Sequence, residues 1–197
     1  MNLANKITMS RVILSIVIMI ILLFPFDELG VDLPSYVVHG NIYVEVKYLV
    51  AGVLFIIASL TDYFDGMVAR KYNMVTDFGK MVDAISDKML TNSLLVILAS
   101  DGMISPVIAV IFIVRDIIVD SIKMVVGNKG HAVAAIGIAK VKTATLMVGL
   151  VLTLFYNLPF ELWGIRVSDC LLIISSILAL ISGFQYYSMS RSYIEAK

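Results

Sequence analysis

The sequence has 197 residues, enough for one compact domain, and we expect a single domain over residues 1–197. Hydrophobic residues make up 60% of the chain and the mean hydropathy is +0.96, well above the composition of a soluble globular protein. The formal net charge is zero, which excludes the basic bias of nucleic-acid-binding proteins, so we expect no nucleic-acid partner. The single cysteine, Cys170, excludes a disulfide framework and a cysteine-based zinc site.

Apolar blocks along the chain have about the length of roughly 20 residues that spans a bilayer core. They cover about residues 7–26, 48–68, 78–99, 103–126, 141–158 and 167–189. An irregular stretch separates the first two blocks, and the third block is apolar only in its second half. The pattern predicts an all-α integral membrane protein, a bundle of six transmembrane helices with both termini on one side.

Lysine and arginine residues are distributed unevenly between the two ends of this predicted bundle. Of the 15 basic residues, only Lys47 and Arg166 fall at the end opposite the termini, and Arg115 lies inside the fourth block. Because basic residues favour the cytoplasmic side of a membrane, we expect both termini in the cytoplasm. The sequence therefore predicts a multi-pass protein of the cell membrane.

The stretch LTDYFDGMVARKYNMVTDFGKMVDAISDK, residues 60–88, brings four aspartates to the cytoplasmic ends of the second and third helices. Asp62 and Asp65 are three positions apart, and Asp83 and Asp87 are four apart, so each pair shares a helix face. If the two helices pack side by side across the short turn between them, the four carboxylates converge.

Four like charges in a poorly hydrated site repel one another, and bound divalent cations relieve that repulsion. A set of oxygen ligands without His or Cys favours Mg2+ or Mn2+. Two such ions are the usual device for a displacement at phosphorus. Gly66, Ala69 and Gly79 lie on the same faces and leave room for a bulky ligand. Solvated interfacial charges are the alternative, but two acidic stripes interleaved with small residues favour the metal site.

The spacing Asp62-x2-Asp65-Gly66-x2-Ala69-Arg70-x8-Gly79-x3-Asp83-x3-Asp87 matches the signature of the CDP-alcohol phosphotransferase family at every specified position. The chain also resembles this family in size and in its predicted six-helix layout. The resemblance implies transfer of a substituted phosphate group from a CDP-linked lipid to an alcohol, with release of CMP, at the cytoplasmic face of the membrane.

The resemblance further implies roles for individual residues. Two divalent cations, Mg2+ or Mn2+, would be held by Asp62, Asp65, Asp83 and Asp87. Asp87 would also be the general base on the acceptor hydroxyl. The CDP-donor site would comprise Asp62, Gly66, Ala69, Arg70 and Gly79, with the three small residues lining the cytidine pocket.

Basic residues in the fourth and fifth predicted helices suggest where the acceptor binds. An unpaired guanidinium within a membrane helix is costly, so Arg115 is a functional candidate, with Asp116, Asp120 and Lys123 on the same helix. Lys140 and Lys142 open the fifth helix, and together these cations could bind a phosphate-bearing acceptor. An internal salt bridge of Arg115 and ordinary snorkelling lysines are the alternatives.

Three further segments are similar to bacterial phosphatidylglycerophosphate synthases, a subfamily whose donor is CDP-diacylglycerol and whose acceptor is sn-glycerol 3-phosphate. They are the opening NLANKITMSR, RDII at 115–118 and KVKT at 140–143. By this resemblance Asn5, Thr8 and Arg11 are candidates for the donor or acceptor phosphates. The chain departs from the subfamily pattern outside the signature, at Ala4, Ala84, Ala139 and Leu146.

The sequence is also compatible with other acceptors and with one other function. An inositol-phosphate acceptor would also need a cationic pocket, and a cardiolipin synthase of this family would use phosphatidylglycerol as acceptor. A divalent-cation transporter would need polar groups in the outer half of the membrane, where residues 49–59 and 94–100 are almost entirely apolar. The family resemblance also suggests a homodimer surrounded by membrane lipids.

Overall fold

The computed structural model describes residues 3–26, 29–31, 33–38, 42–71, 77–131 and 136–195. Within these ranges it describes all side chains except those of residues 3–7, 62–71, 77–78, 80 and 194–195.

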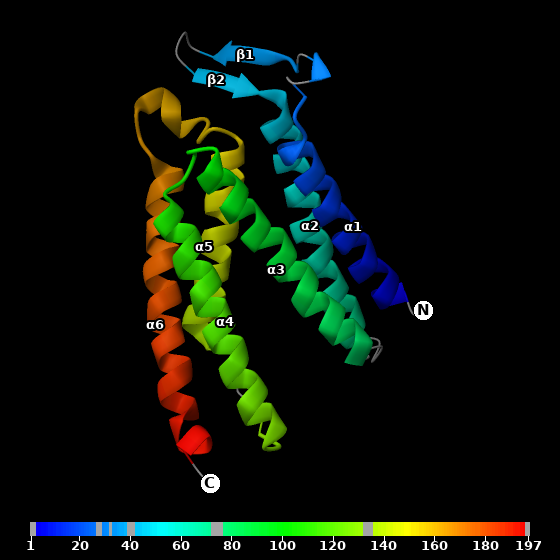
Figure 1. Ribbon diagram of the computed structural model, residues 1–197, viewed down its shortest axis with the longest axis vertical. Coiled ribbons are helices and arrows are strands. Elements are labelled where there is room, and N and C mark those ends of the chain that lie inside the picture. Colours follow the sequence, from blue (N-terminus) through cyan, green and yellow to red (C-terminus); the bar gives the residue numbers. More distant parts are fainter. Residues whose placement is uncertain are drawn as a thin grey trace.

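Long helices dominate the described chain and alternate in direction (Figure 1). They are α1 (Leu3–Leu23), α2 (Val46–Lys71), α3 (Asp77–Ser100), α4 (Pro106–Asn128), α5 (Gly137–Leu154) and α6 (Val167–Glu195). Each of these six helices corresponds to one apolar block of the sequence, which confirms the predicted all-α architecture. Both chain ends lie towards the same end of the bundle (Figure 1).

A small β-hairpin crosses the opposite end of the bundle, where the sequence predicted only an irregular stretch (Figure 1). Strands β1 (Ser35–Val38) and β2 (Ile42–Glu45) pair antiparallel, with Ser35 opposite Glu45 and Val38 opposite Ile42. Their β-branched and aromatic residues favour extended backbone, which explains why this prediction was wrong. The strands are only four residues each, too short for the length of an apolar block to reveal them.

Two tyrosine hydroxyl groups form hydrogen bonds at this end of the bundle, one with the hairpin and one with the turn between α3 and α4. The Tyr156 hydroxyl, just after α5, accepts a hydrogen bond from the Glu45 backbone N–H at 3.1 Å. The Tyr48 hydroxyl donates to an Asp101 carboxylate oxygen in the α3–α4 turn at 2.7 Å. The two rings meet edge to face, with centroids 5.8 Å apart. This end of the bundle is therefore cross-linked by polar contacts.

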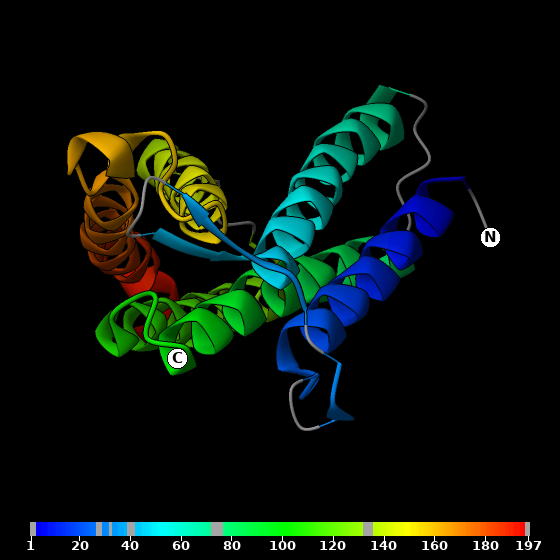
Figure 2. The ribbon, with the colours of Figure 1, turned by 90° about the horizontal axis from the view of Figure 1, so that it is seen from above.

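Helix packing differs from the predicted arrangement in one respect. Helix α1 packs against both α2 and α3, whereas α2 and α3 do not form one of the main helix pairs within the described chain. Figure 2 shows α2 and α3 inclined to each other rather than side by side. On the other side of the bundle, α6 packs against both α4 and α5. Direct α2–α3 packing, on which the expected convergence of the carboxylates depended, is therefore not among the main helix contacts of the described residues, and α1 packs against both helices.

Two glycines allow neighbouring helices to approach closely. A Cβ atom on Gly52 of α2 would lie 2.7 Å from Cε2 of Phe155, and one on Gly149 of α5 would lie 2.9 Å from Cδ2 of Leu172 on α6. Both distances are too short for real carbon–carbon contacts, so a side chain at either position would have to displace the Phe155 ring or the Leu172 side chain. The core around them is apolar and includes Phe55 and Leu150.

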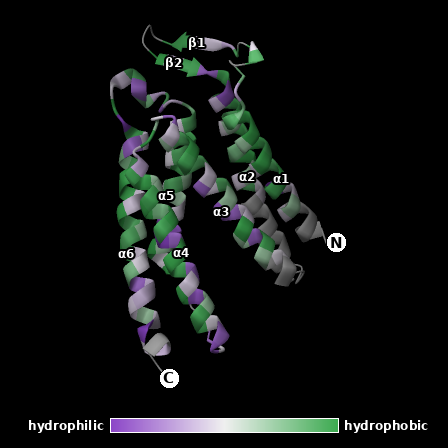
Figure 3. Ribbon diagram, in the orientation of Figure 1, coloured by the Kyte–Doolittle hydropathy of each residue, from purple (hydrophilic) through white to green (hydrophobic). Residues whose placement is uncertain are grey.

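Hydrophobic residues predominate along the helices (Figure 3), and many of them are exposed. Side chains such as Ile20, Val110 and Ile177 are more than half exposed. In the described part of the chain, two helical segments are long and apolar enough to cross a membrane, Gly137–Leu154 and Val167–Tyr193. Large apolar outer surfaces of this kind suggest a membrane protein.

Candidate active site

Arg11 of α1 is buried and holds two residues of α3. Its Nε donates to the Ser86 hydroxyl at 2.8 Å. Its Nη2 donates to the Asp83 carboxylate at 2.5 Å and to the Asp83 backbone carbonyl at 3.3 Å. Asp83 and Ser86 are three positions apart and so share the α3 face that meets α1. Arg11 therefore contacts one of the expected metal ligands.

Asp83 and Asp87 retain oxygen atoms that could bind a cation. The Asp83 side chain is 55% exposed, and Arg11 contacts only its Oδ1 oxygen. Asp87 is half-buried, and within the described part of the chain its carboxylate has no hydrogen-bond or ion-pair partner. Carboxylate oxygens are the preferred ligands of hard divalent cations, and these two residues still have such oxygens available. They therefore fit the predicted Mg2+ or Mn2+ site.

The remaining residues of the aspartate motif lie on α2. The α2 backbone is helical through them, but the side chains of Asp62, Asp65, Gly66, Ala69 and Arg70 lie outside the described residues. The described side chains alone contain no group of three acidic, His or Cys residues able to hold a metal ion. The convergence of the four carboxylates therefore stays a prediction.

Two other predicted donor-site residues are described. Thr8 is buried on α1, one helical turn before Arg11, and Gly79 is partly buried on α3, one turn before Asp83. Both therefore lie beside the Arg11–Asp83 pair along their own helices. Asn5 lies in α1, but its side chain is outside the described residues.

A second group of charges lies where α4, α5 and α6 meet. Arg115 Nη1 donates to Asp116 Oδ1 at 2.9 Å, and Lys142 Nζ lies 3.6 Å from the same oxygen. Arg115 Nη2 donates to the Ser182 hydroxyl of α6 at 2.9 Å. The structure thus brings Arg115 and Lys142 together around one carboxylate, so the predicted internal salt bridge of Arg115 exists within a larger cluster.

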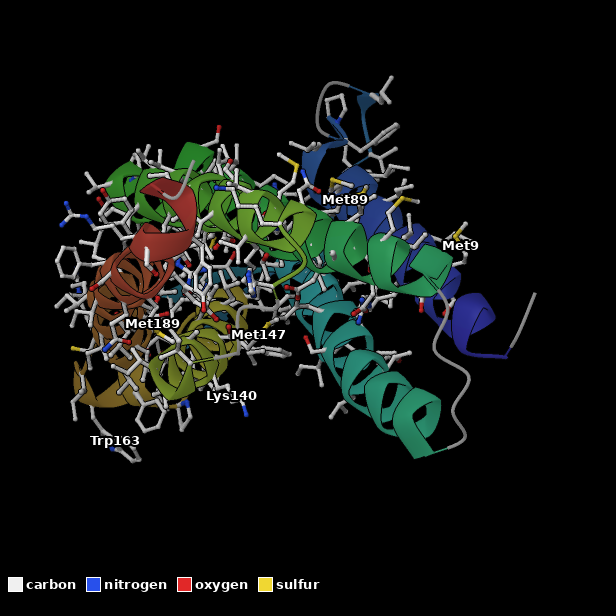
Figure 4. The ribbon with its side chains drawn as sticks, turned by 90° about the horizontal axis from the view of Figure 1, so that it is seen from below. Met9, Met89, Lys140, Met147, Trp163 and Met189 are labelled. Carbon is white, nitrogen blue, oxygen red and sulfur yellow. The ribbon has the colours of Figure 1, made fainter. Side chains whose placement is uncertain are left out.

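The other two residues expected in the acceptor pocket lie elsewhere. Lys140 is exposed and points away from the bundle (Figure 4). Its position two residues before the buried Lys142 places it on nearly the opposite face of α5. Arg11 lies between α1 and α3, paired with Asp83. Of the four cations predicted to bind the acceptor, Arg115 and Lys142 therefore lie together, whereas Lys140 and Arg11 lie apart from them.

Sequence reasoning missed several residues that complete this charge network. Ser182 and Tyr186 of α6 approach Arg115, although both belong to a largely apolar block of the sequence. Lys88 of α3 forms an ion pair with Asp120 of α4, which links the two halves of the bundle. Ser86 was also missed, because a serine beside an aspartate carries no distinguishing signal in a single sequence.

Asp87 connects the two groups of charges. It interacts electrostatically with Arg11 and Asp83 on one side and with Lys142 and Asp116 on the other. A carboxylate within range of both groups is suited to receive a proton from a substrate held by the cations. This arrangement is the strongest geometric indication of an active site.

Comparison with known proteins identifies the family of the chain. Residues 1–183 match the family model of CDP-alcohol phosphatidyltransferase. The chain belongs to the CDP-alcohol phosphatidyltransferase family.

Curated relatives within this family share a single name, CDP-diacylglycerol–glycerol-3-phosphate 3-phosphatidyltransferase. The chain is 36% identical to the one from Bacillus subtilis (strain 168), over 95% of this chain and 94% of the relative. It is 32% identical to that of Mycoplasma genitalium, over 85% of this chain and 68% of the relative. It is 31% identical to that of Rickettsia bellii, over 74% of this chain and 81% of the relative.

Replacing Asp116 by Asn should destabilise the protein, because Arg115 and Lys142 are buried and would lose the charge that they share. Removal of one partner from a buried ion pair typically lowers the free energy of unfolding by about 3 kcal/mol. Asp169→Asn is the matched control, since Asp169 forms an exposed pair with Arg166 whose loss costs about 0–1 kcal/mol. Thermal unfolding in detergent measures both, and equal effects would contradict the shared role of Asp116.

Proposed function

We propose that this protein transfers the phosphatidyl group of CDP-diacylglycerol to sn-glycerol 3-phosphate, forming phosphatidylglycerophosphate and CMP. The observation that carries the proposal is the complete aspartate motif, in a chain that matches relatives of this name over most of its length. The cluster of Arg115 and Lys142 supports a phosphate-bearing acceptor, because Arg and Lys are the usual partners of phosphate.

The reaction would take place at the cytoplasmic face of a six-helix membrane bundle whose termini are both cytoplasmic. Support comes from the alternating helices, the apolar outer surface and the concentration of basic residues at one end. The relatives named above come from bacteria, so the bacterial cell membrane is the expected location. A homodimer is part of this proposal by analogy with the family.

Roles for the motif residues follow from their chemistry. Two divalent cations, Mg2+ or Mn2+, bound by Asp62, Asp65, Asp83 and Asp87, would offset the negative charge of the donor pyrophosphate. Gly66, Ala69 and Gly79 would leave room for cytidine, while Arg70 and Thr8 would contact the donor.

Asp87 would accept the proton of the acceptor hydroxyl as that oxygen attacks the phosphatidyl phosphorus and CMP leaves. Its position within electrostatic range of both Asp83 and Lys142 supports this assignment. Arg115 and Lys142 would hold the acceptor phosphate, so that the hydroxyl is presented to Asp87. Lys140 and Arg11 are not part of this pocket: Lys140 is exposed, and Arg11 holds Asp83.

An acceptor screen tests the proposed reaction. Purified protein with CDP-diacylglycerol and Mg2+ should release CMP when given sn-glycerol 3-phosphate, and EDTA should stop the release. Parallel reactions with inositol phosphate, phosphatidylglycerol and glycerol serve as comparisons, and lipid products are identified by mass spectrometry. CMP release with another acceptor but none with sn-glycerol 3-phosphate would refute the proposal.

Replacing Asp87 by Asn should lower kcat by at least about 100-fold, which is the lower range for loss of a general base. Binding of the CDP-linked donor should persist in part, because the neutral amide keeps the shape of the side chain. The same substitution at Asp169, at the opposite end of the bundle, should leave turnover unchanged. Turnover of Asp87→Asn within a few-fold of the unmodified protein would exclude its role as base.

A further inference from the structure

Tyr186 of α6 is a buried aromatic residue beside the second group of charges. Its side chain is 2% exposed, whereas the adjacent Tyr187 is 48% exposed. Its hydroxyl accepts a hydrogen bond at 3.4 Å from the backbone N–H of Ile136, the residue before α5. Tyr186 thus reaches from α6 to the start of the helix that carries Lys142.

Cations from two positions of α4 approach the Tyr186 ring. The Arg115 Cζ atom lies 5.7 Å from the ring centroid, and the Lys123 Nζ atom lies 5.0 Å from it. Both distances fall within the range of about 6 Å in which the ring quadrupole attracts a cation. One buried ring therefore contacts two cations that are eight positions apart on the same helix.

An aromatic ring orders cations in a different way from a carboxylate. Asp116 binds Arg115 and Lys142 but cancels one positive charge, and Asp120 does the same for Lys88. Tyr186 attracts Arg115 and Lys123 without cancelling any charge. The cations Lys88, Arg115, Lys123 and Lys142 therefore outnumber the carboxylates Asp116 and Asp120 that pair with them.

An ordered excess of positive charge suits a phosphate monoester. Such a group carries about −1.5 to −2 charges at neutral pH, more than the phosphodiester of a typical membrane lipid. Asp87 interacts electrostatically with two of these cations, Lys142 and Lys88. An acceptor phosphate bound here would be within reach of the proposed base.

We propose that Tyr186 is a positioning residue that holds Arg115 and Lys123 for the phosphate monoester of the acceptor without adding a negative charge beside them. This inference rests on the proposed function, adds Tyr186 to the acceptor site and gives Lys123 a contact within it. It also gives a physical reason for preferring a soluble phosphate monoester over phosphatidylglycerol as acceptor.

The test compares Tyr186→Leu, Tyr186→Phe and the neighbouring control Tyr187→Leu in the full-length protein. Loss of two cation–π contacts in Tyr186→Leu should raise the KM for sn-glycerol 3-phosphate about tenfold, with the KM for CDP-diacylglycerol within about twofold of the unmodified protein. Tyr186→Phe keeps the ring and should restore most of the acceptor affinity. Tyr187→Leu should leave both KM values unchanged.

A purely structural role gives a different result. If Tyr186→Leu raised both KM values equally, or if Tyr186→Phe were as impaired as Tyr186→Leu, the positioning role would be overturned. Thermal unfolding of each variant reports on folding. Should Tyr186→Leu fail to fold, Lys123→Gln provides the test, because Lys123 is exposed. It should raise the acceptor KM alone, and an unchanged acceptor KM would overturn the proposal.

Failure of this inference can be distinguished from failure of the proposed function. If the unmodified protein released no CMP with sn-glycerol 3-phosphate, the proposed reaction would be wrong, and this inference with it. If the unmodified protein turned over normally while Tyr186→Leu kept its acceptor KM, only the role of Tyr186 would be excluded.

Discussion

Compensation of buried charge is the constraint on which the polar interior of this bundle depends. Isolated charges among apolar helices are costly, so each must find a partner of opposite charge or a polarisable neighbour. Asp116 forms ion pairs with both Arg115 and Lys142, and Asp83 forms an ion pair with Arg11. These pairs join α1 to α3 and α4 to α5. The same contacts that stabilise the bundle therefore fix the positions of the groups assigned to the reaction.

Much of the architecture follows from the sequence because its signals are local. Six apolar blocks of membrane-spanning length correspond to the six helices, and a spacing of four places Asp83 and Asp87 on one face of α3. The cost of an unpaired guanidinium within a membrane helix also marked Arg115 correctly as a residue with polar partners. Helical periodicity and the cost of burying charge are sufficient for these conclusions.

The remainder depends on which helix faces meet, and a single sequence does not contain that information. The position of α1 against both α2 and α3 determines that Arg11 contacts Asp83 and Ser86. Tyr186 belongs to an apolar segment that looks like packing until α4 is placed beside it. Lys140 and Lys142 lie in one short motif, and both were predicted to bind the acceptor phosphate. Their positions on α5 place them on nearly opposite faces of that helix.

The central claim is that acidic residues of α2 and α3 share divalent ions next to the ordered cations of α4 and α5. A structure of the protein with Mn2+ and CDP-diacylglycerol, with the metal located by anomalous scattering, tests it most directly. The account predicts two Mn2+ positions in contact with Asp62, Asp65, Asp83 and Asp87, with the pyrophosphate of the donor beside them. Aspartates of α2 that point away from Asp83 and Asp87, with no metal between the two helices, would contradict it.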